Sequence, residues 1–220
     1  MTNQKTLLLL CLALGACDGT TSPGTDSGSM MGTDGGPMTD TGSMLGQPAE
    51  VTIQFGGCTD FTACGGDPTG TWDYDSICIE DPFADVRDAC GTITFEDTMG
   101  TARGRVRLDG ATVSRDVTVM ISATAIFDPS CAIAGCDTIE GALRMALTSA
   151  SCAANAGGGC DCAISETVRI DETDGYRVEG TQVITDDGTT YDFCVAGGTM
   201  QHREIGENPD EPGILGLTRR

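Results

Sequence analysis

Cysteine is the residue that most constrains how this chain can fold. Ten of the 12 cysteines lie between positions 58 and 194. An even number of cysteines in one stretch is typical of an exported domain that is cross-linked by disulfides. We therefore expect up to five disulfides, with a connectivity that spacing alone does not define, among Cys58, Cys64, Cys78, Cys90, Cys131, Cys136, Cys152, Cys160, Cys162 and Cys194.

Zinc binding is the alternative for closely spaced cysteines such as Cys160 and Cys162. The chain has only one histidine, His202, to complete a zinc site. Zinc sites built from cysteines are also typical of reducing compartments rather than exported domains. We expect disulfides here, and neither a metal nor another cofactor.

The N-terminus has the features of an export signal. Lys5 precedes an apolar run over residues 7–14, and the small residues Gly15 and Ala16 follow before Cys17. The run is too short to span a membrane as a helix, and no later run reaches that length. We expect residues 1–16 to be a signal peptide that is removed in the mature protein.

The sequence Leu14-Gly15-Ala16-Cys17 resembles the bacterial lipobox, which is a leucine, two small residues and a cysteine. The resemblance implies cleavage after Ala16, attachment of diacylglycerol to the Cys17 sulfur and acylation of the new amino group. Each buried methylene contributes about 0.8 kcal/mol, so two or three acyl chains would anchor the protein stably. An ordinary signal peptide with a nearby cysteine is the alternative. Asp18 resembles the inner-membrane retention signal of enteric bacteria, and the choice of membrane stays open.

Residues 17–49 have a composition that cannot build a core. From Asp18 to Ala49 there is no aromatic, lysine or arginine, and Leu45 is the only large aliphatic residue apart from methionines. A unit that starts with Thr-Asp and ends with Met occurs three times, at residues 25–30, 33–38 and 39–44. Such a chain is a disordered tether of about 30 Å mean length. Metal capture by its aspartates or methionines is the weaker alternative, because the aspartates are sparse and no histidine or cysteine joins the methionines.

Acidic residues dominate the charge of the chain. There are 33 of them against 12 basic residues, and Lys5, the only lysine, is lost with the signal peptide. The mature chain then has a net charge of 11 minus 33, or about −22, which disfavours nucleic acids and anionic lipid headgroups as partners. A chain without lysine also has no Schiff-base chemistry and no P-loop.

Beyond Pro48, apolar and polar residues alternate with a period of two. The alternation covers residues 51–55, 93–95, 117–127, 164–170 and 191–195. It predicts strands with one buried face, and four turn dipeptides lie between or beside them: Asp109-Gly110, Asp174-Gly175, Asp187-Gly188 and Gly197-Gly198. We expect a mainly β domain over residues 50–207, an antiparallel barrel or sandwich of roughly 8–10 strands, followed by a flexible tail over residues 208–220.

Two short helices are expected to interrupt the strands. Asp81-Pro82 precedes residues 83–90, and Asp137 with Glu140 forms a capping-box pattern at the start of the second helix. The first helix is expected to end before Gly91.

Two charged residues fall on apolar faces. If Asp109-Gly110 forms a two-residue turn, Arg103 faces Asp116 and Arg115 lies on the apolar face. Glu166 lies in a similar position further along the chain. We expect β-bulges to turn both side chains outward; a polar spot in the interior is the alternative.

Two further resemblances concern the domain. Residues 64–72 and 191–195 resemble uncharacterised cysteine-rich lipoproteins of Gram-negative predatory soil bacteria, which implies the architecture and a cell-envelope location but no activity. Gly70-Thr71-Trp72 resembles the Gly-x-Trp of the first lipocalin strand, where the tryptophan packs against an arginine on the last strand. That resemblance implies Arg203 as the partner of Trp72.

These observations favour binding over catalysis. We expect a lipid-anchored envelope protein, facing the periplasm or the cell surface, that binds a small apolar ligand or an envelope protein inside its β domain. The alternative is a structural or interaction protein without a pocket. We expect no enzyme, because His202 lies on a strand expected to be exposed and no Gly-x-Ser-x-Gly or His-Glu-x-x-His motif occurs. A carboxylate pair is the remaining route to a hydrolase.

The lipid anchor is tested by Cys17→Ser. Cells grown with a radioactive fatty acid should label the native protein and leave the variant unlabelled, because the cysteine sulfur is the attachment site that the lipobox implies. The variant should also be unprocessed or soluble. Equal labelling of the two proteins would contradict the lipobox interpretation.

Overall fold

The computed structural model describes residues 46–83, 87, 90–206, 209 and 213–220. The expected signal peptide, Cys17 and nearly all of the tether lie outside these residues. The expected helix over residues 83–90 also lies mostly outside them. These expectations remain predictions.

The described residues are mainly β, as the alternation predicts. Their elements, in chain order, are β1 (Val51–Phe55), β2 (Gly70–Ile79), β3 (Thr94–Asp109), β4 (Thr112–Phe127), α3 (Cys136–Ala146), β5 (Ser149–Ala154), β6 (Cys160–Glu179), β7 (Gln182–Thr185), β8 (Thr190–Ala196), β9 (Thr199–Ile205) and β10 (Ile214–Arg219).

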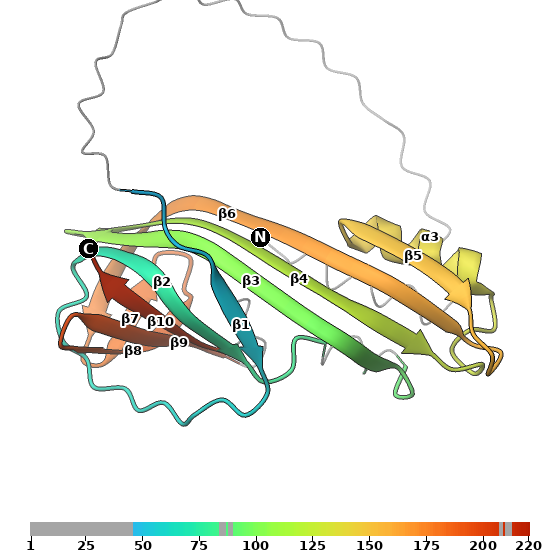
Figure 1. The fold of residues 1–220 in the computed structure, drawn as a ribbon. Coiled ribbons are helices and arrows are strands. Elements are labelled where there is room, and N and C mark those ends of the chain that lie inside the picture. The colour runs from blue at the N-terminus through green and yellow to red at the C-terminus, as the bar shows by residue number, and fades with distance from the viewer. Residues whose placement is uncertain (1–45, 84–86, 88–89, 207–208, 210–212) are drawn as a thin grey trace, which may run out of the picture.

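Hydrogen-bonded pairs connect eight of these strands in a continuous circuit. The antiparallel pairs run from β2 through β3, β4, β6, β7, β8, β9 and β10, and β10 pairs again with β2. This circuit makes one end of the molecule barrel-like (Figure 1). The expectation of a mainly β barrel or sandwich is confirmed. One pair departs from the expected antiparallel pattern: β1 is parallel to β2 and antiparallel to β3.

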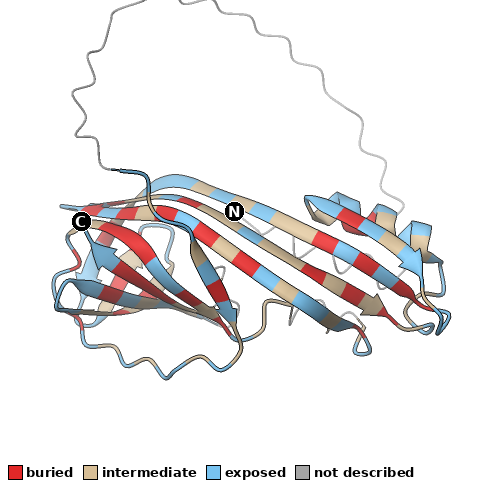
Figure 2. Cartoon of the chain, in the orientation of Figure 1, coloured by how far each residue is buried: buried red, intermediate tan, exposed pale blue. Residues whose placement is uncertain are grey.

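Three strands extend beyond the barrel-like end. β3 and β4 have 16 residues each and β6 has 20, which is about 65 Å of extended chain for β6. At their far end β5 pairs with β6, and α3 lies beside β5 (Figure 1). Alternate residues of β4 from Val113 to Phe127 face inward, and buried positions occur at both ends of this stripe (Figure 2).

The two ends have separate hydrophobic cores. The barrel-like end buries Trp72, Phe193 and Leu217 almost completely. The far core is smaller and includes Ile93 and Phe127 together with two disulfide cysteines. A small core needs covalent reinforcement, and three of the disulfides lie at this end.

All ten cysteines of the domain are paired, so the expectation of up to five disulfides is confirmed. Cys160 and Cys162 are alternate residues of β6 and face the same side, where they reach different partners. The pairs are Cys58–Cys78, Cys64–Cys194, Cys90–Cys131, Cys136–Cys160 and Cys152–Cys162.

Two of the four predicted turns form as expected. Asp187-Gly188 connects β7 to β8, and Gly197-Gly198 connects β8 to β9 with both glycines at positive φ. The prediction for Asp174-Gly175 is wrong, because β6 continues through this dipeptide and changes its partner from β4 to β7. The Asp186 carboxylate lies against Gly175, where a Cβ would stand, so a larger residue would require this carboxylate to move.

The turn between β3 and β4 is shifted by one residue. Asp109 pairs with Thr112, so Gly110 and Ala111 form the turn, with Gly110 at a φ of 64°. Arg105 therefore faces Asp116, and the predicted pairing of Arg103 with Asp116 is wrong.

The second predicted helix exists, but its predicted cap does not. α3 begins at Cys136, and Gly135 occupies the N-cap position without a side-chain hydrogen bond. Glu140 instead accepts a hydrogen bond from the Cys152 amide and pairs with Arg144. Glu166 lies in unbroken strand register rather than at a bulge, and its carboxylate accepts a hydrogen bond from the Thr148 amide.

The prediction that residues 208–220 form a flexible tail is wrong for residues 214–219. Ile214–Arg219 forms β10, which lies between β2 and β9. Leu215 and Leu217 alternate along this strand and are buried in the barrel core. Alternating apolar residues thus continue to the end of the domain.

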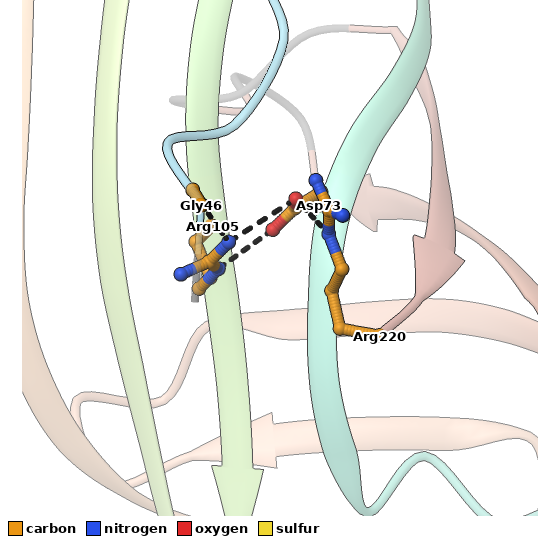
Figure 3. Close-up of polar contacts among 4 residues, drawn as sticks. All are labelled: Gly46, Asp73, Arg105 and Arg220. Carbon is orange, nitrogen blue, oxygen red and sulfur yellow. Dashed lines mark hydrogen bonds and ion pairs between the residues drawn. The ribbon is translucent and has the colours of Figure 1, made fainter. Parts of the chain in front are cut away.

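β10 leads into an ion cluster on the outer side of the sheet (Figure 3). The Asp73 side chain is 8% exposed and accepts hydrogen bonds from Arg105 Nε at 2.6 Å and Arg220 Nε at 2.5 Å. Burial raises the pKa of Asp73, but the hydrogen bonds from the two arginines outweigh it, so the pKa is below its usual value. Arg105 Nη2 also donates to the Gly46 carbonyl at 3.0 Å. The cluster therefore joins β2, β3, the end of β10 and the segment before β1.

We predict that Asp73→Asn lowers the free energy of unfolding by about 2 kcal/mol, because the neutral amide leaves two arginines without their shared carboxylate. Urea unfolding with intact disulfides measures the change. Asp75→Asn is the matched control, since Asp75 is exposed on the same strand. Equal effects of the two substitutions would contradict a structural role for the cluster.

Candidate functional site

A cavity of about 50 Å³ lies inside the barrel-like end. Five strands each contribute two alternate residues to its wall, as expected for inward-facing positions of neighbouring strands. Six of the ten residues are apolar, and the polar ones are an arginine, a threonine, a tyrosine and a histidine. The lining is Val106, Leu108, Val113, Arg115, Val183, Thr185, Tyr191, Phe193, Met200 and His202.

Arg115 is the charged residue of the cavity wall. It lies in regular register opposite Val106 of β3 and Glu172 of β6, and its side chain is only 12% exposed. The prediction of a bulge at Arg115 is therefore wrong, and the alternative of a polar spot in the interior is correct. A buried guanidinium is stable only where it has partners, and this one has them.

The Arg115 guanidinium contacts a phenol and a carboxylate. Its Nη1 donates a hydrogen bond of 2.7 Å to the Tyr191 hydroxyl, and the guanidinium carbon lies 5.7 Å from the centre of the Tyr191 ring. Its Nη2 lies 2.6 Å from Oε1 of Glu172, whose side chain is 52% exposed. The guanidinium therefore connects a cavity-lining phenol to a carboxylate at the solvent side.

His202 lines the cavity. The prediction that it lies on an exposed strand is therefore wrong. β9 lies between β8 and β10, and His202 pairs with Phe193 on one side and Leu215 on the other. Its ring makes an edge contact with the Tyr191 ring, with centres 5.7 Å apart. Burial and the Arg115 charge lower the pKa of His202 to about 4, so the imidazole is neutral at pH 7.

Thr185 is polar but turns its hydroxyl away from the cavity. The hydroxyl oxygen lies 2.5 Å from Oδ1 of Asp187 and 3.0 Å from the Thr189 carbonyl, both in the following turn. Hydrogen bonding from Thr185 and from the Thr189 amide lowers the pKa of Asp187. Arg115, Tyr191 and His202 are thus the polar groups that face the cavity.

The outer wall of the cavity is held by the segment before β2. Cys64 is bonded to Cys194 of β8, and the amides of Cys64 and Gly65 donate to the Phe193 carbonyl at 3.1 and 3.0 Å. The Val195 amide in turn donates to the Gly65 carbonyl at 2.8 Å. β8, which supplies Tyr191 and Phe193 to the cavity, is therefore fixed from outside by a disulfide and backbone hydrogen bonds.

Trp72 lies in the barrel core but not in the cavity wall. Its indole nitrogen donates to the Pro68 carbonyl at 2.8 Å, and the Arg219 guanidinium carbon lies 4.4 Å from its ring centre. The implied partner Arg203 is therefore wrong; it lies over Phe61 instead. Arg219 occupies the position because β10, not β9, is the last strand.

The predicted site residues and the cavity overlap only in part. The disulfide cysteines brace the cavity without lining it, and Cys17 lies outside the described residues. Arg115 and His202 were singled out in the sequence for separate reasons, with no predicted contact between them. Tyr191 was predicted only as one residue of an apolar stripe. The signal for Arg115 was a charged residue within an apolar stripe; nothing in the sequence placed His202 beside it.

Among the described residues, no group of three or more histidine, cysteine, aspartate or glutamate side chains comes together in a way that could hold a metal ion. No helix in the described part of the chain is long and apolar enough to cross a membrane.

Comparison with known proteins gives no match to a protein family, to a curated protein or to a solved structure.

The neutral His202 predicts a pH-dependent stability. The unfolded chain binds a proton near pH 6.5 and the folded chain only near pH 4, so the unfolded state binds more protons in between and stability falls as the pH is lowered. We expect a loss of about 2 kcal/mol between pH 7 and pH 5, and a much smaller loss in His202→Gln. Urea unfolding at the two pH values measures both. Parallel losses in the two proteins would contradict a buried neutral histidine.

Proposed function

We propose that this protein is a lipid-anchored lipoprotein of a Gram-negative cell envelope, and that its β domain is a binding module for a small ligand. The lipobox, the tether composition and the ten cysteines of an exported domain support the location. The cavity with three converging polar side chains is the observation that supports binding.

The chemistry of the cavity favours binding over catalysis. Nucleophilic catalysis needs a nucleophile beside a base, and the residues lining this cavity include neither serine nor cysteine. His202 has an edge contact to Tyr191, and every cysteine of the domain is held in a disulfide. What the cavity offers is a fixed cation, a phenol and a neutral imidazole within apolar walls, which suits recognition of a polar head attached to an apolar group.

The size of the cavity restricts the ligand. A volume of about 50 Å³ admits a few water molecules or a small group, whereas pockets that enclose drug-sized ligands have about 300–1,000 Å³. The ligand is therefore small, or only its head group enters. Because the disulfide to Cys194 and the backbone bonds to β8 hold the wall in place, little ordering is needed on binding.

A structural envelope protein without a ligand is the second candidate. The small volume of the cavity favours it, since a few waters bonded to Arg115, Tyr191 and His202 could fill the space. A test of binding must therefore distinguish a cavity that takes a ligand from a cavity that holds only water.

Val183→Phe provides that test, because a phenylalanine at this buried wall position fills the cavity. We expect at least one compound from a panel of two- to six-carbon acids, alcohols, amines and ketones to raise the Tm of the native domain by a few degrees at about ten times its Kd. The shift should disappear in Val183→Phe. It should persist in Val178→Phe, because Val178 is exposed and lies outside the lining.

Thermal unfolding with intact disulfides is the measurement, and near-ultraviolet circular dichroism checks that both variants are folded. No shift with any compound would favour the structural alternative. An equal shift in Val183→Phe would place the binding site outside the cavity.

A further inference from the structure

We propose that the cavity ligand is a small carboxylate, which binds Arg115 by replacing Glu172 as the anionic partner of its guanidinium. This inference rests on the proposed binding function and specifies its ligand class. It is carried by the contrast between the two members of the ion pair: Arg115 is buried in the cavity wall, and Glu172 is half exposed.

The permanent positive charge of Arg115 favours a negatively charged ligand. A guanidinium remains protonated throughout the physiological pH range, and at a site that is only 12% exposed it needs an anion or several acceptors nearby. The other cavity-facing polar groups, Tyr191 and the neutral His202, add no second charge. Arg115 thus brings a permanent positive charge into the cavity wall, although the chain as a whole is strongly acidic.

Glu172 occupies the place that a ligand carboxylate would take. Arg115 and Glu172 are cross-strand partners on β4 and β6, so the carboxylate reaches Nη2 from the neighbouring strand, at the solvent side of the cavity wall. A half-exposed carboxylate is readily solvated when its partner is taken away, and the buried guanidinium stays paired if a ligand carboxylate takes its place. Replacing Glu172 therefore costs little, and a carboxylate in its place keeps the guanidinium paired.

The remaining wall accepts the rest of such a ligand. Tyr191 holds Nη1 of the guanidinium and fixes its orientation, so Nη2 stays directed at the incoming carboxylate. The apolar lining, with Val106, Leu108 and Phe193 among its members, suits a short alkyl group. A carboxylate with a short alkyl chain satisfies both parts of the cavity, whereas an amine would place a second cation beside Arg115.

Three other described arginines of the long strands have different surroundings. Arg105 is held by Asp73 on the outer side of the sheet, and Arg107 pairs with Asp109 where both are well exposed. Arg169 lies between Asp116 and Asp171, again in solvent. Of these four arginines, Arg115 is the one that lines the cavity described above.

Butyrate is the probe, with butanol and butylamine as controls of the same chain length. Isothermal titration of the full disulfide-bonded domain should show binding of butyrate and little binding of the other two. Glu172→Gln removes the competing carboxylate and should tighten butyrate binding about threefold to fivefold, which is the size of a half-exposed ion pair. Arg115→Met should abolish it.

Glu179→Gln is the matched control for Glu172→Gln. Glu179 is also on β6, is 59% exposed and pairs with Arg177, so its substitution changes the net charge equally without touching the cavity. Butyrate affinity should be unchanged in Glu179→Gln. If Arg115→Met does not fold, the comparison of the two glutamate variants still decides whether Glu172 competes with butyrate for Arg115.

The outcomes separate this inference from the proposed function. If butanol binds as well as butyrate and both still bind Arg115→Met, the cavity is a ligand site but the carboxylate assignment is wrong. If inorganic phosphate competes as strongly as butyrate, the site is a general anion site and the assignment is also wrong. If Glu179→Gln tightens binding as much as Glu172→Gln, the effect is one of net charge and Glu172 is not the competitor. If no probe binds any folded variant, the carboxylate assignment is wrong, and the wider panel of two- to six-carbon compounds decides whether the cavity binds a ligand at all.

Discussion

The pairing of β4 with β3 on one side and with β6 on the other connects everything else in this domain. Both ladders run along nearly the whole of β4, and the same inward stripe of that strand serves the barrel core and the far core. Because successive side chains alternate between two faces, a slip of one residue in either ladder would expose the stripe at both ends together. The same register places Arg115 inside, between Val106 and Glu172. The cavity is thus a consequence of how β4 is aligned.

Period-two alternation was sufficient to predict a mainly β domain, because it follows from the two faces of each strand. The even number of cysteines was sufficient to predict disulfides, because it allows every cysteine to be paired. They could not predict connectivity, since Cys64 and Cys194 are 130 residues apart and meet only through the sheet. Turn dipeptides were reliable where a strand ends, as at Gly197-Gly198. They failed at Asp174-Gly175, where β6 stays extended and passes from its pairing with β4 to its pairing with β7.

The site was less predictable than the fold. Arg115 conflicted with its apolar stripe, and the usual resolution of such a conflict is a bulge; the partners that make burial acceptable, Tyr191 and Glu172, lie 76 and 57 positions away in sequence. The position of His202 depends on β10, which lies in a segment that was predicted to be a flexible tail. Once β10 is a strand, β9 lies inside the sheet and its histidine faces the cavity. The wrong prediction for one segment thus changed the expected environment of a residue 12 positions before β10 begins.

The position of β10 between β2 and β9 also sets an order of events in biogenesis. A chain made from its N-terminus contains β2 long before β10, yet these two strands are neighbours and the pairing of Asp73 with Arg220 forms only when β10 is in place. Until β10 emerges, the edges of β2 and β9 have no partner, and open strand edges promote association between chains. The sheet therefore stays open between β2 and β9 until β10 has been made, and a domain that lacks β10 exposes two strand edges that the complete domain covers.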